Sequence, residues 1–187
     1  MSRRRARPST HEPVNADAGR DDRPAIASQR DGRVAWTVQR ESFMPEATER
    51  VPGSLLALVA DDDEDMRALV AGVLSADGYT VLEACDGEEL LEQLERSVDD
   101  PLTRPDVVVT DIMMPRLSGL GVLDAIRRAQ LHLPVVLMTV LPDEAVYLVA
   151  RRLGAAGVLH KPFGPAEIRA AVVRASLTHA TRPMLRP

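Results

Sequence analysis

The sequence predicts an α/β protein built on a doubly wound, five-stranded parallel sheet with helices on both faces. Three observations support this fold class. From Leu55 onward, five short apolar runs alternate with five segments of helical periodicity. Apolar residues fill consecutive positions in runs such as 107–109, which is typical of strands buried on both faces. Strands that alternate with helices through short loops predict parallel strands joined by right-handed crossovers, a (βα)5 domain.

The predicted strands are four to six residues long and mainly aliphatic. Aromatic residues make up only 3% of the chain, so the core must consist of leucine, valine, isoleucine, alanine and methionine. The five strands are predicted at Leu55–Ala60, Thr80–Ala84, Asp106–Thr110, Pro134–Thr139 and Gly157–His160.

The first three helices carry both apolar periodicity and start signals. From Met66 onward, apolar residues recur at i, i+3, i+4, i+7 and i+8, which gives the first helix one apolar face. Asp86 precedes the second helix, and Glu89 three residues later completes the pattern of a capping box. Ser118 has a side chain that can cap the third helix.

The last two helices lie in the C-terminal part of the chain. The fourth is expected to begin after Pro142, with acidic residues in its first turn, and to end near Gly154. The fifth is expected from about Pro165 to Leu177. Together with the strands, they complete a single domain.

Charge divides the chain into three parts. Residues 1–53 carry ten arginines against eight acids, residues 54–180 carry eleven bases against twenty acids, and residues 181–187 add two arginines. The predicted folded part is therefore acidic, which argues against nucleic-acid binding. No apolar run is long enough to span a membrane. The single cysteine, Cys85, excludes an internal disulfide and favours a cytoplasmic location.

The domain organisation follows from the same division. Residues 1–53 lack sustained periodicity and are expected to form a mostly disordered tail, with a short strand at Val34–Val38 as the alternative. Translation from Met44 would remove most of this tail. Residues 54–180 are expected to form the folded domain, and residues 181–187 a short C-terminal tail. Too few residues follow the fifth helix for an effector domain, so a single-domain protein is expected.

Polar residues gather at the carboxyl ends of the predicted strands, where doubly wound sheets bind ligands. Asp61 and Asp62 follow the first strand and Asp111 follows the third. Thr139 ends the fourth strand, and Lys161, the single lysine among 23 basic residues, follows the fifth. Each residue by itself has an ordinary structural role as a cap or turn. Their convergence from four separate strand ends predicts one site.

The residue types of this site indicate phosphoryl chemistry. Three neighbouring carboxylates repel one another unless a proton or a cation compensates them. Hard oxygen ligands that are open to water suit Mg²⁺. An aspartate beside Mg²⁺ can attack a phosphoryl group and form an aspartyl phosphate. The Thr139 hydroxyl and the Lys161 ammonium are the donors that would bind two phosphoryl oxygens.

The stretches that carry these residues resemble the receiver (response regulator) domain of two-component signalling. The resemblance covers about residues 55–178 and includes all five signature positions in order. The matching stretches are Leu58–Asp63, Asp111–Pro115, Ser118–Gly119, Val136–Thr139, Gly154–Ala155 and Lys161–Phe163.

The resemblance implies a flavodoxin-like fold with strand order 2-1-3-4-5 and a role for each site residue. It implies that Asp111 accepts a phosphoryl group from a sensor histidine kinase or a histidine phosphotransfer protein. Asp62, Asp111 and the main-chain carbonyl of Met113 would hold Mg²⁺, and Asp61 would bind it mainly through water. Thr139 and Lys161 would grip the phosphoryl oxygens. Such a protein is a phosphoacceptor and not a turnover enzyme.

The resemblance also implies how the signal leaves the domain. The face formed by the fourth helix, fifth strand and fifth helix would change shape and signal to a protein partner, or form a homodimer. A cis peptide bond is expected between Lys161 and Pro162.

Two positions depart from the family pattern. Val140 occupies a position that is usually small, and its bulk is expected to slow labelling of Asp111 by small phosphodonors. Val158 stands where relatives commonly carry a tyrosine or phenylalanine that rotates inward on activation. Because valine has no ring to rotate, the coupling from Thr139 to the output face must take another form.

Two alternatives from other functional classes remain open. A hydrolase of the haloacid-dehalogenase type also uses an aspartate nucleophile with threonine, lysine and Mg²⁺. In that family, however, the nucleophile comes first and the acidic pair last, whereas here the pair Asp61 and Asp62 precedes Asp111. The second alternative is a receiver-fold interaction module that works without phosphorylation. The two departures from the family pattern, Val140 and Val158, favour this alternative.

Overall fold

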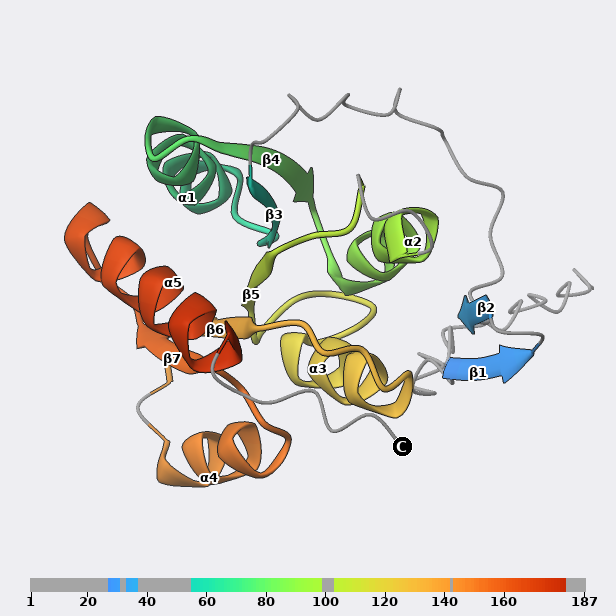
Figure 1. Cartoon of the computed structure of the whole chain (residues 1–187). Helices are drawn as coiled ribbons and strands as arrows, with labels where there is room; N and C mark the ends of the chain where they lie inside the picture. Colours follow the sequence, from blue (N-terminus) through green and yellow to red (C-terminus); the bar gives the residue numbers. More distant parts are fainter. Residues whose placement is uncertain (1–26, 31–32, 37–54, 99–102, 142, 181–187) are drawn as a thin grey trace, which may run out of the picture.

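The structure, a computed structural model, describes residues 27–30, 33–36, 55–98, 103–141 and 143–180. Its main body is a parallel sheet of five strands, ordered β4-β3-β5-β6-β7 (Figure 1). Counted within this sheet, the order is 2-1-3-4-5, so the predicted fold class and strand order are confirmed. The strands are β3 (Leu55–Ala60), β4 (Tyr79–Ala84), β5 (Val107–Asp111), β6 (Val135–Thr139) and β7 (Gly157–His160).

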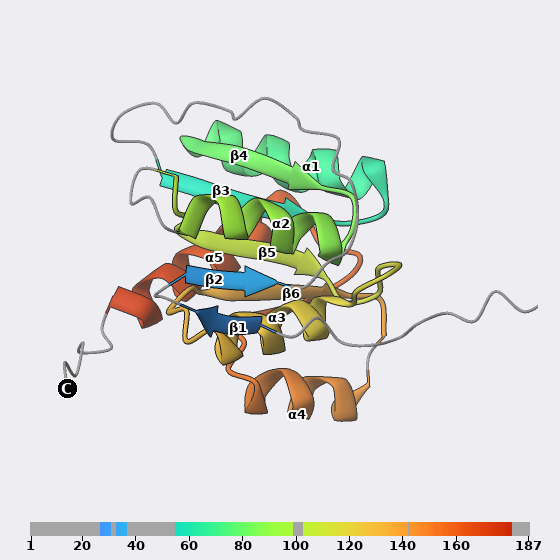
Figure 2. The same ribbon diagram turned by 90° about the vertical axis from the view of Figure 1, so that its right-hand side faces the viewer.

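Five helices alternate with these strands and cover the two faces of the sheet. α1 and α5 pack on one face, and α2, α3 and α4 lie on the other (Figures 1 and 2). The helices are α1 (Glu64–Ala76), α2 (Gly87–Val98), α3 (Gly119–Arg128), α4 (Glu144–Arg152) and α5 (Pro165–Ala180). Helix and strand boundaries lie close to the predicted ones.

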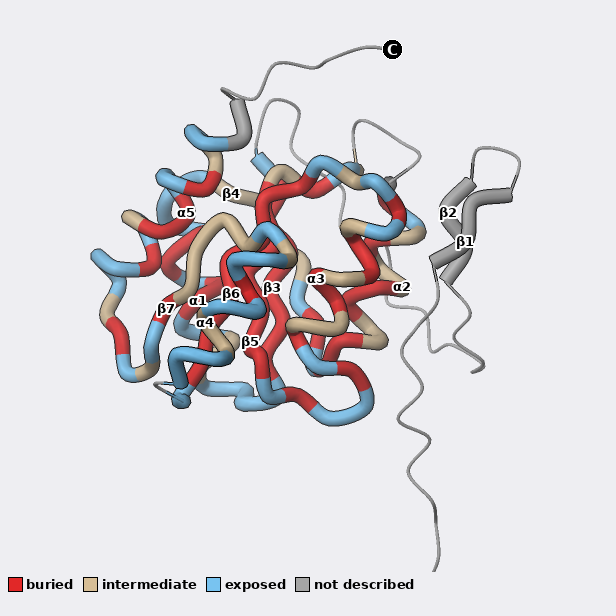
Figure 3. The backbone as a smooth tube through the Cα atoms, turned by 90° about the horizontal axis from the view of Figure 1, so that it is seen from below, coloured by how far each residue is buried: buried red, intermediate tan, exposed pale blue. Residues whose placement is uncertain are grey.

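Burial on both faces explains the consecutive apolar residues of the central strands. Every residue of β5 and β6 is buried, and Figure 3 shows this burial along the strands in red. Val107 and Val109 belong to the core beneath α1 and α5, whereas Val108 belongs to the core beneath α2 and α3. A strand with one solvated face would need polar residues at alternate positions, whereas these strands carry polar residues only at their carboxyl ends.

The predicted helix caps are present. The Ser118 hydroxyl accepts from the backbone N–H of Gly121 (3.2 Å) and caps α3. The Asp86 carboxylate accepts from the N–H groups of Glu88 and Glu89 at 2.9 and 3.0 Å and caps α2. The Glu89 carboxylate accepts from Cys85 N–H (2.8 Å), one residue before the position that a capping box predicts.

A short hairpin precedes the domain. β1 (Ala27–Arg30) pairs antiparallel with β2 (Arg33–Trp36), and the hairpin lies beside α2 and α3 (Figure 2). These strands lie within the predicted disordered tail, and β2 overlaps the alternative strand at Val34–Val38. The rest of residues 1–53, including Met44, and residues 181–187 lie outside the described ranges.

No helix in the described ranges has the length and apolar character that a membrane crossing requires.

Candidate functional site

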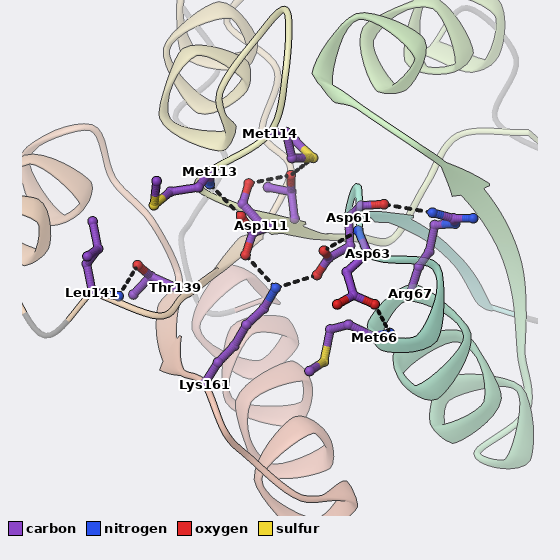
Figure 4. A network of polar contacts seen from close by, with 11 residues as sticks. Asp61, Asp63, Met66, Arg67, Asp111, Met113, Met114, Thr139, Leu141 and Lys161 are labelled. Atoms are coloured by element: carbon purple, nitrogen blue, oxygen red, sulfur yellow. Dashed lines mark hydrogen bonds and ion pairs between the residues drawn. The ribbon is translucent and has the colours of Figure 1, made fainter.

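Three strand ends bring Asp61, Asp111 and Lys161 together (Figure 4). Asp61 follows β3, Asp111 ends β5, and Lys161 follows β7. The Lys161 Nζ atom lies 2.7 Å from Asp61 Oδ2 and 2.6 Å from Asp111 Oδ1. Both carboxylates are almost fully buried. The predicted convergence of these three side chains is therefore present, with one ammonium placed between two carboxylates.

Burial and this shared ammonium determine the electrostatics. Burial alone would lower the pKa of Lys161, but hydrogen bonds to Asp111 and Asp61 outweigh it and raise this pKa above its ordinary value. Burial raises the pKa of Asp61, and the hydrogen bond from Lys161 offsets only part of that increase. Lys161 is thus held in its charged form by the pair of carboxylates.

The backbone around Asp111 leaves little room for movement. The second oxygen of its carboxylate, Oδ2, accepts from the backbone N–H of Met113. Gly119, at the start of α3, packs against the Asp111 main chain, where a Cβ would overlap the Asp111 carbonyl oxygen. Only glycine fits this close approach. The chain from Asp111 to α3 is therefore held tightly around the carboxylate.

The predicted metal ligands form a fitting set of donors. Asp61, Asp62, Asp111 and the Met113 carbonyl offer oxygen atoms only, as Mg²⁺ prefers. Asp62 is exposed, and in the part of the chain that the structure describes it forms no ion pair with Lys161, unlike the other two carboxylates. Three carboxylates against the single Lys161 ammonium leave an excess of negative charge. A divalent cation would compensate it.

A second acidic cluster was not predicted from the sequence. Within the described ranges, Cys85, Asp86 and Glu89 form a group whose ligand atoms lie within 4.8 Å of one another. Asp86 already forms an ion pair with Arg116. The hydrogen bond to Glu89, together with burial, raises the pKa of the Cys85 thiol and disfavours the thiolate that a metal would need.

Thr139 lies on the same edge, but its side chain is engaged elsewhere. Its hydroxyl accepts from the backbone N–H of Leu141 (3.0 Å), and Figure 4 shows it turned toward Leu141. Its main-chain oxygen accepts from Lys161 N–H (2.7 Å), which ties the ends of β6 and β7 together. The structure thus brings Thr139 next to the site with its hydroxyl directed away from Asp111.

The remaining predicted positions are also placed. Val140 is exposed beside Thr139, as is the side chain of Met113 beside Asp111. Val158 is partly buried against the core on the α4 side of the sheet. The Lys161–Pro162 peptide bond is cis, as expected.

Sequence reasoning missed Arg67, which contacts the main chain of the site from α1. Its guanidinium donates to the Asp61 main-chain oxygen (2.8 Å) and pairs with Glu83 on β4 (3.2 Å). The available signal was a single basic residue two positions after the acidic run 61–65.

Comparisons with known proteins agree with this geometry. Residues 57–173 match the family model of the response regulator receiver domain. The chain is 36% identical over 115 residues to the alkaline phosphatase synthesis transcriptional regulatory protein PhoP of Bacillus subtilis, covering 62% of this chain and 45% of that protein. It is 32% identical to the transcriptional regulatory protein CpxR of Escherichia coli K12, covering 62% and 46%. The chain spans about half the length of the curated relatives it matches.

Solved receiver domains superpose on the same region. The signal receiver domain of NarL from Mycobacterium tuberculosis is 30% identical with a TM-score of 0.60, covering 69% of this chain and 98% of that one. The receiver domain of NtrX from Brucella abortus is 34% identical with a TM-score of 0.57, covering 65% and 98%. Receiver domains are phosphoacceptors of two-component signalling and not turnover enzymes. By its sequence match and its strand order, this chain belongs to the response regulator receiver domain family.

Proposed function

We propose that this chain is a response regulator that accepts a phosphoryl group on Asp111 from the phosphohistidine of a histidine kinase or histidine phosphotransfer protein. The observation that supports this most is the contact of one ammonium, Lys161, with both Asp61 and Asp111 at a buried strand edge. The receiver domain, residues 54–180, would carry this function in the cytoplasm, flanked by the tails 1–53 and 181–187.

The transfer itself is a displacement at phosphorus. A carboxylate oxygen of Asp111 forms a bond to phosphorus while the bond between phosphorus and the histidine nitrogen breaks, and its electron pair returns to the imidazole. Lys161, whose ammonium contacts Asp111, would donate to a phosphoryl oxygen on Asp111. Mg²⁺, bound by Asp62, Asp111 and the Met113 carbonyl with Asp61 in its water shell, would neutralise charge on the phosphoryl oxygens.

The proposed switch begins at Thr139. Because its hydroxyl is turned toward Leu141, the side chain would have to rotate, and so lose the hydrogen bond from Leu141 N–H, to bring its O–H to a phosphoryl oxygen on Asp111. That exchange would release the segment between β6 and α4. The face formed by α4, β7 and α5 would then signal to a protein partner or a second copy of the chain.

Two observations favour the second candidate, an interaction module that works without phosphorylation. In the structure, the Thr139 hydroxyl is turned away, and Val140 carries exposed bulk beside it. If Val140 closes access to Asp111, partners would bind the same face regardless of any phosphoryl group.

Labelling decides between the two candidates. The full chain is incubated with acetyl phosphate and Mg²⁺, and its intact mass is measured. The proposed function predicts one added phosphoryl group in the native chain, none in Asp111→Asn, and none in the native chain once EDTA has removed Mg²⁺. An unlabelled native chain, tested also with a phosphorylated histidine phosphotransfer protein, would favour the interaction module.

A further inference from the structure

Arg67 is a mostly buried arginine that reaches back from α1 to the end of β3. Its side chain is 17% exposed. Its Nη1 atom donates to the main-chain oxygen of Asp61 at 2.8 Å, and its Nε atom donates to Glu83 Oε2 on the neighbouring strand β4 at 3.2 Å (Figure 4 shows the first contact). One guanidinium thereby joins α1, the end of β3 and β4.

The main chain that Arg67 contacts is the acidic turn, residues 61–63. Two other contacts shape this turn: Asp61 N–H donates to the Ala84 carbonyl (3.3 Å), and Asp63 N–H donates to Asp61 Oδ1 (3.1 Å). The second uses the carboxylate that also contacts Lys161. Arg67 instead donates to the main-chain oxygen of Asp61. Its guanidinium therefore does not pair with either carboxylate oxygen of Asp61.

We propose that Arg67, braced by Glu83, is the positioning residue that keeps the acidic turn arranged for a divalent cation. This inference rests on the proposed function of the site. Like charges at Asp61, Asp62 and Asp63 push the turn apart when no cation is bound. A guanidinium fixed by two hydrogen bonds opposes this separation of the turn residues. It does so without taking the place of the cation, because it contacts a main-chain oxygen on the α1 side of the turn.

Charge and position predict opposite effects on cation affinity. If Arg67 acted only as a nearby positive charge, its removal would reduce repulsion of Mg²⁺ and tighten binding. If it positions the turn, its removal weakens binding, because the ligands must be ordered by the cation itself. Outer residues that orient metal ligands typically change affinity by about 10-fold to 100-fold when they are lost.

The experiment measures Mg²⁺ affinity in the full chain by NMR, from the amide signals of residues 61–63 and 111–113. We expect Arg67→Met to bind Mg²⁺ about tenfold more weakly than the native chain. Arg67→Lys keeps the charge but loses the planar fork that serves two acceptors, so its affinity should also fall, to a smaller extent. Glu83→Met, which removes the acceptor that braces Arg67, should resemble Arg67→Lys.

Arg169→Met is the matched control. Arg169 forms a two-bond ion pair with Asp77 at the other end of α1, at 2.8 and 2.9 Å, and does not contact the acidic turn. Its removal should leave Mg²⁺ affinity unchanged. A second series at about 1 M KCl, where the Debye length falls to about 3 Å, suppresses the charge effect and should leave the difference between Arg67→Met and native protein in place.

The outcomes are separable. Affinity in Arg67→Met that equals or exceeds the native value at high salt overturns the positioning role. If Arg67→Met does not fold, as far-ultraviolet circular dichroism would show, the affinities of Arg67→Lys and Glu83→Met provide the test, and native affinity in both overturns the positioning role. A native chain that binds no Mg²⁺ contradicts the proposed function first, whereas native binding with unaffected variants contradicts this inference alone.

Discussion

The two helices at the β6–β7 edge of the sheet differ in how firmly they are held. α5 buries Ile168, Ala171, Val172 and Ala175 in the core beneath the sheet. α4 buries only Ala150 among its nine residues, and Leu148 and Val149 are exposed. Local stability follows buried apolar contact, so α4 is the element that can move at low cost while α5 keeps its place.

The same contrast divides the functional site. The acidic side, Asp61, Asp111 and Lys161, is buried and linked through one ammonium. The switch side, which we define as Thr139–Leu141, leads directly into α4 and carries exposed Val140. Under the proposed function, the residues that would bind the phosphoryl group are thus already in contact, whereas α4, the helix that would respond, is lightly packed. Four predictions test this division, beginning with the largest expected effect.

Lys161→Met should break the acidic side. It leaves the buried carboxylates of Asp61 and Asp111 without their shared cation, and loss of one partner from such a buried pair typically costs about 3 kcal/mol. Urea unfolding without Mg²⁺ should show this loss, and added Mg²⁺ should recover part of it. Unchanged stability in the variant would mean that the ammonium does not hold the two carboxylates together.

Thr139→Ala should separate labelling from switching. The variant loses a hydroxyl that accepts one hydrogen bond, so its free energy of unfolding should fall by about 1 kcal/mol. Acetyl phosphate should still label Asp111, because the acidic side is intact. Amide exchange over residues 143–178 should change on labelling in the native chain and not in Thr139→Ala. An equal change in both would show that the switch does not run through Thr139.

Val140→Ala tests whether the switch side limits the access of small phosphodonors to Asp111. Removing the exposed bulk beside Thr139 should speed labelling by acetyl phosphate severalfold. Labelling by a phosphorylated histidine phosphotransfer protein is the comparison, because a docked partner delivers its phosphoryl group by a different approach. If the small donor labels Val140→Ala no faster than native protein, access to Asp111 is not limited at this residue.

The smallest expected effect concerns pH. Because burial raises the folded-state pKa of Asp61, the folded chain binds this proton more tightly than the unfolded chain. Its contribution to stability is therefore fully present below the unfolded value near 3.8 and is lost as the pH rises through the folded value. The carboxyl carbon signal of Asp61, followed by NMR without Mg²⁺, should titrate above 3.8. Titration at or below that value would contradict the expectation.

Strand ends explain why so much of the site was predictable. Parallel strands place their carboxyl ends on one edge, so Asp61, Asp111 and Lys161 could be brought together from pattern alone. The hydroxyl of Thr139 could not be oriented, because its rotamer depends on a backbone N–H two residues later. The contact of Arg67 was equally hidden, since it depends on the distance between α1 and β4.

The hairpin is the opposite case, because the sequence between its strands carries a local turn signal. β1 and β2 are separated by two residues, Asp31 and Gly32. Such a pair between two short strands is among the strongest local indicators of a hairpin. The surrounding residues are rich in arginine and lack periodicity, a pattern that by itself predicts a disordered tail.

Lys161 has one practical consequence, because no other lysine occurs in the chain. Reagents that acylate amines react with the uncharged form of lysine. The carboxylates of Asp61 and Asp111 keep the Lys161 side chain protonated, and only 11% of it is exposed. Its rate of acetylation would therefore rise when those contacts open and fall when they close. A single chemical label would then report the occupancy of the site, with the amino terminus as the internal reference.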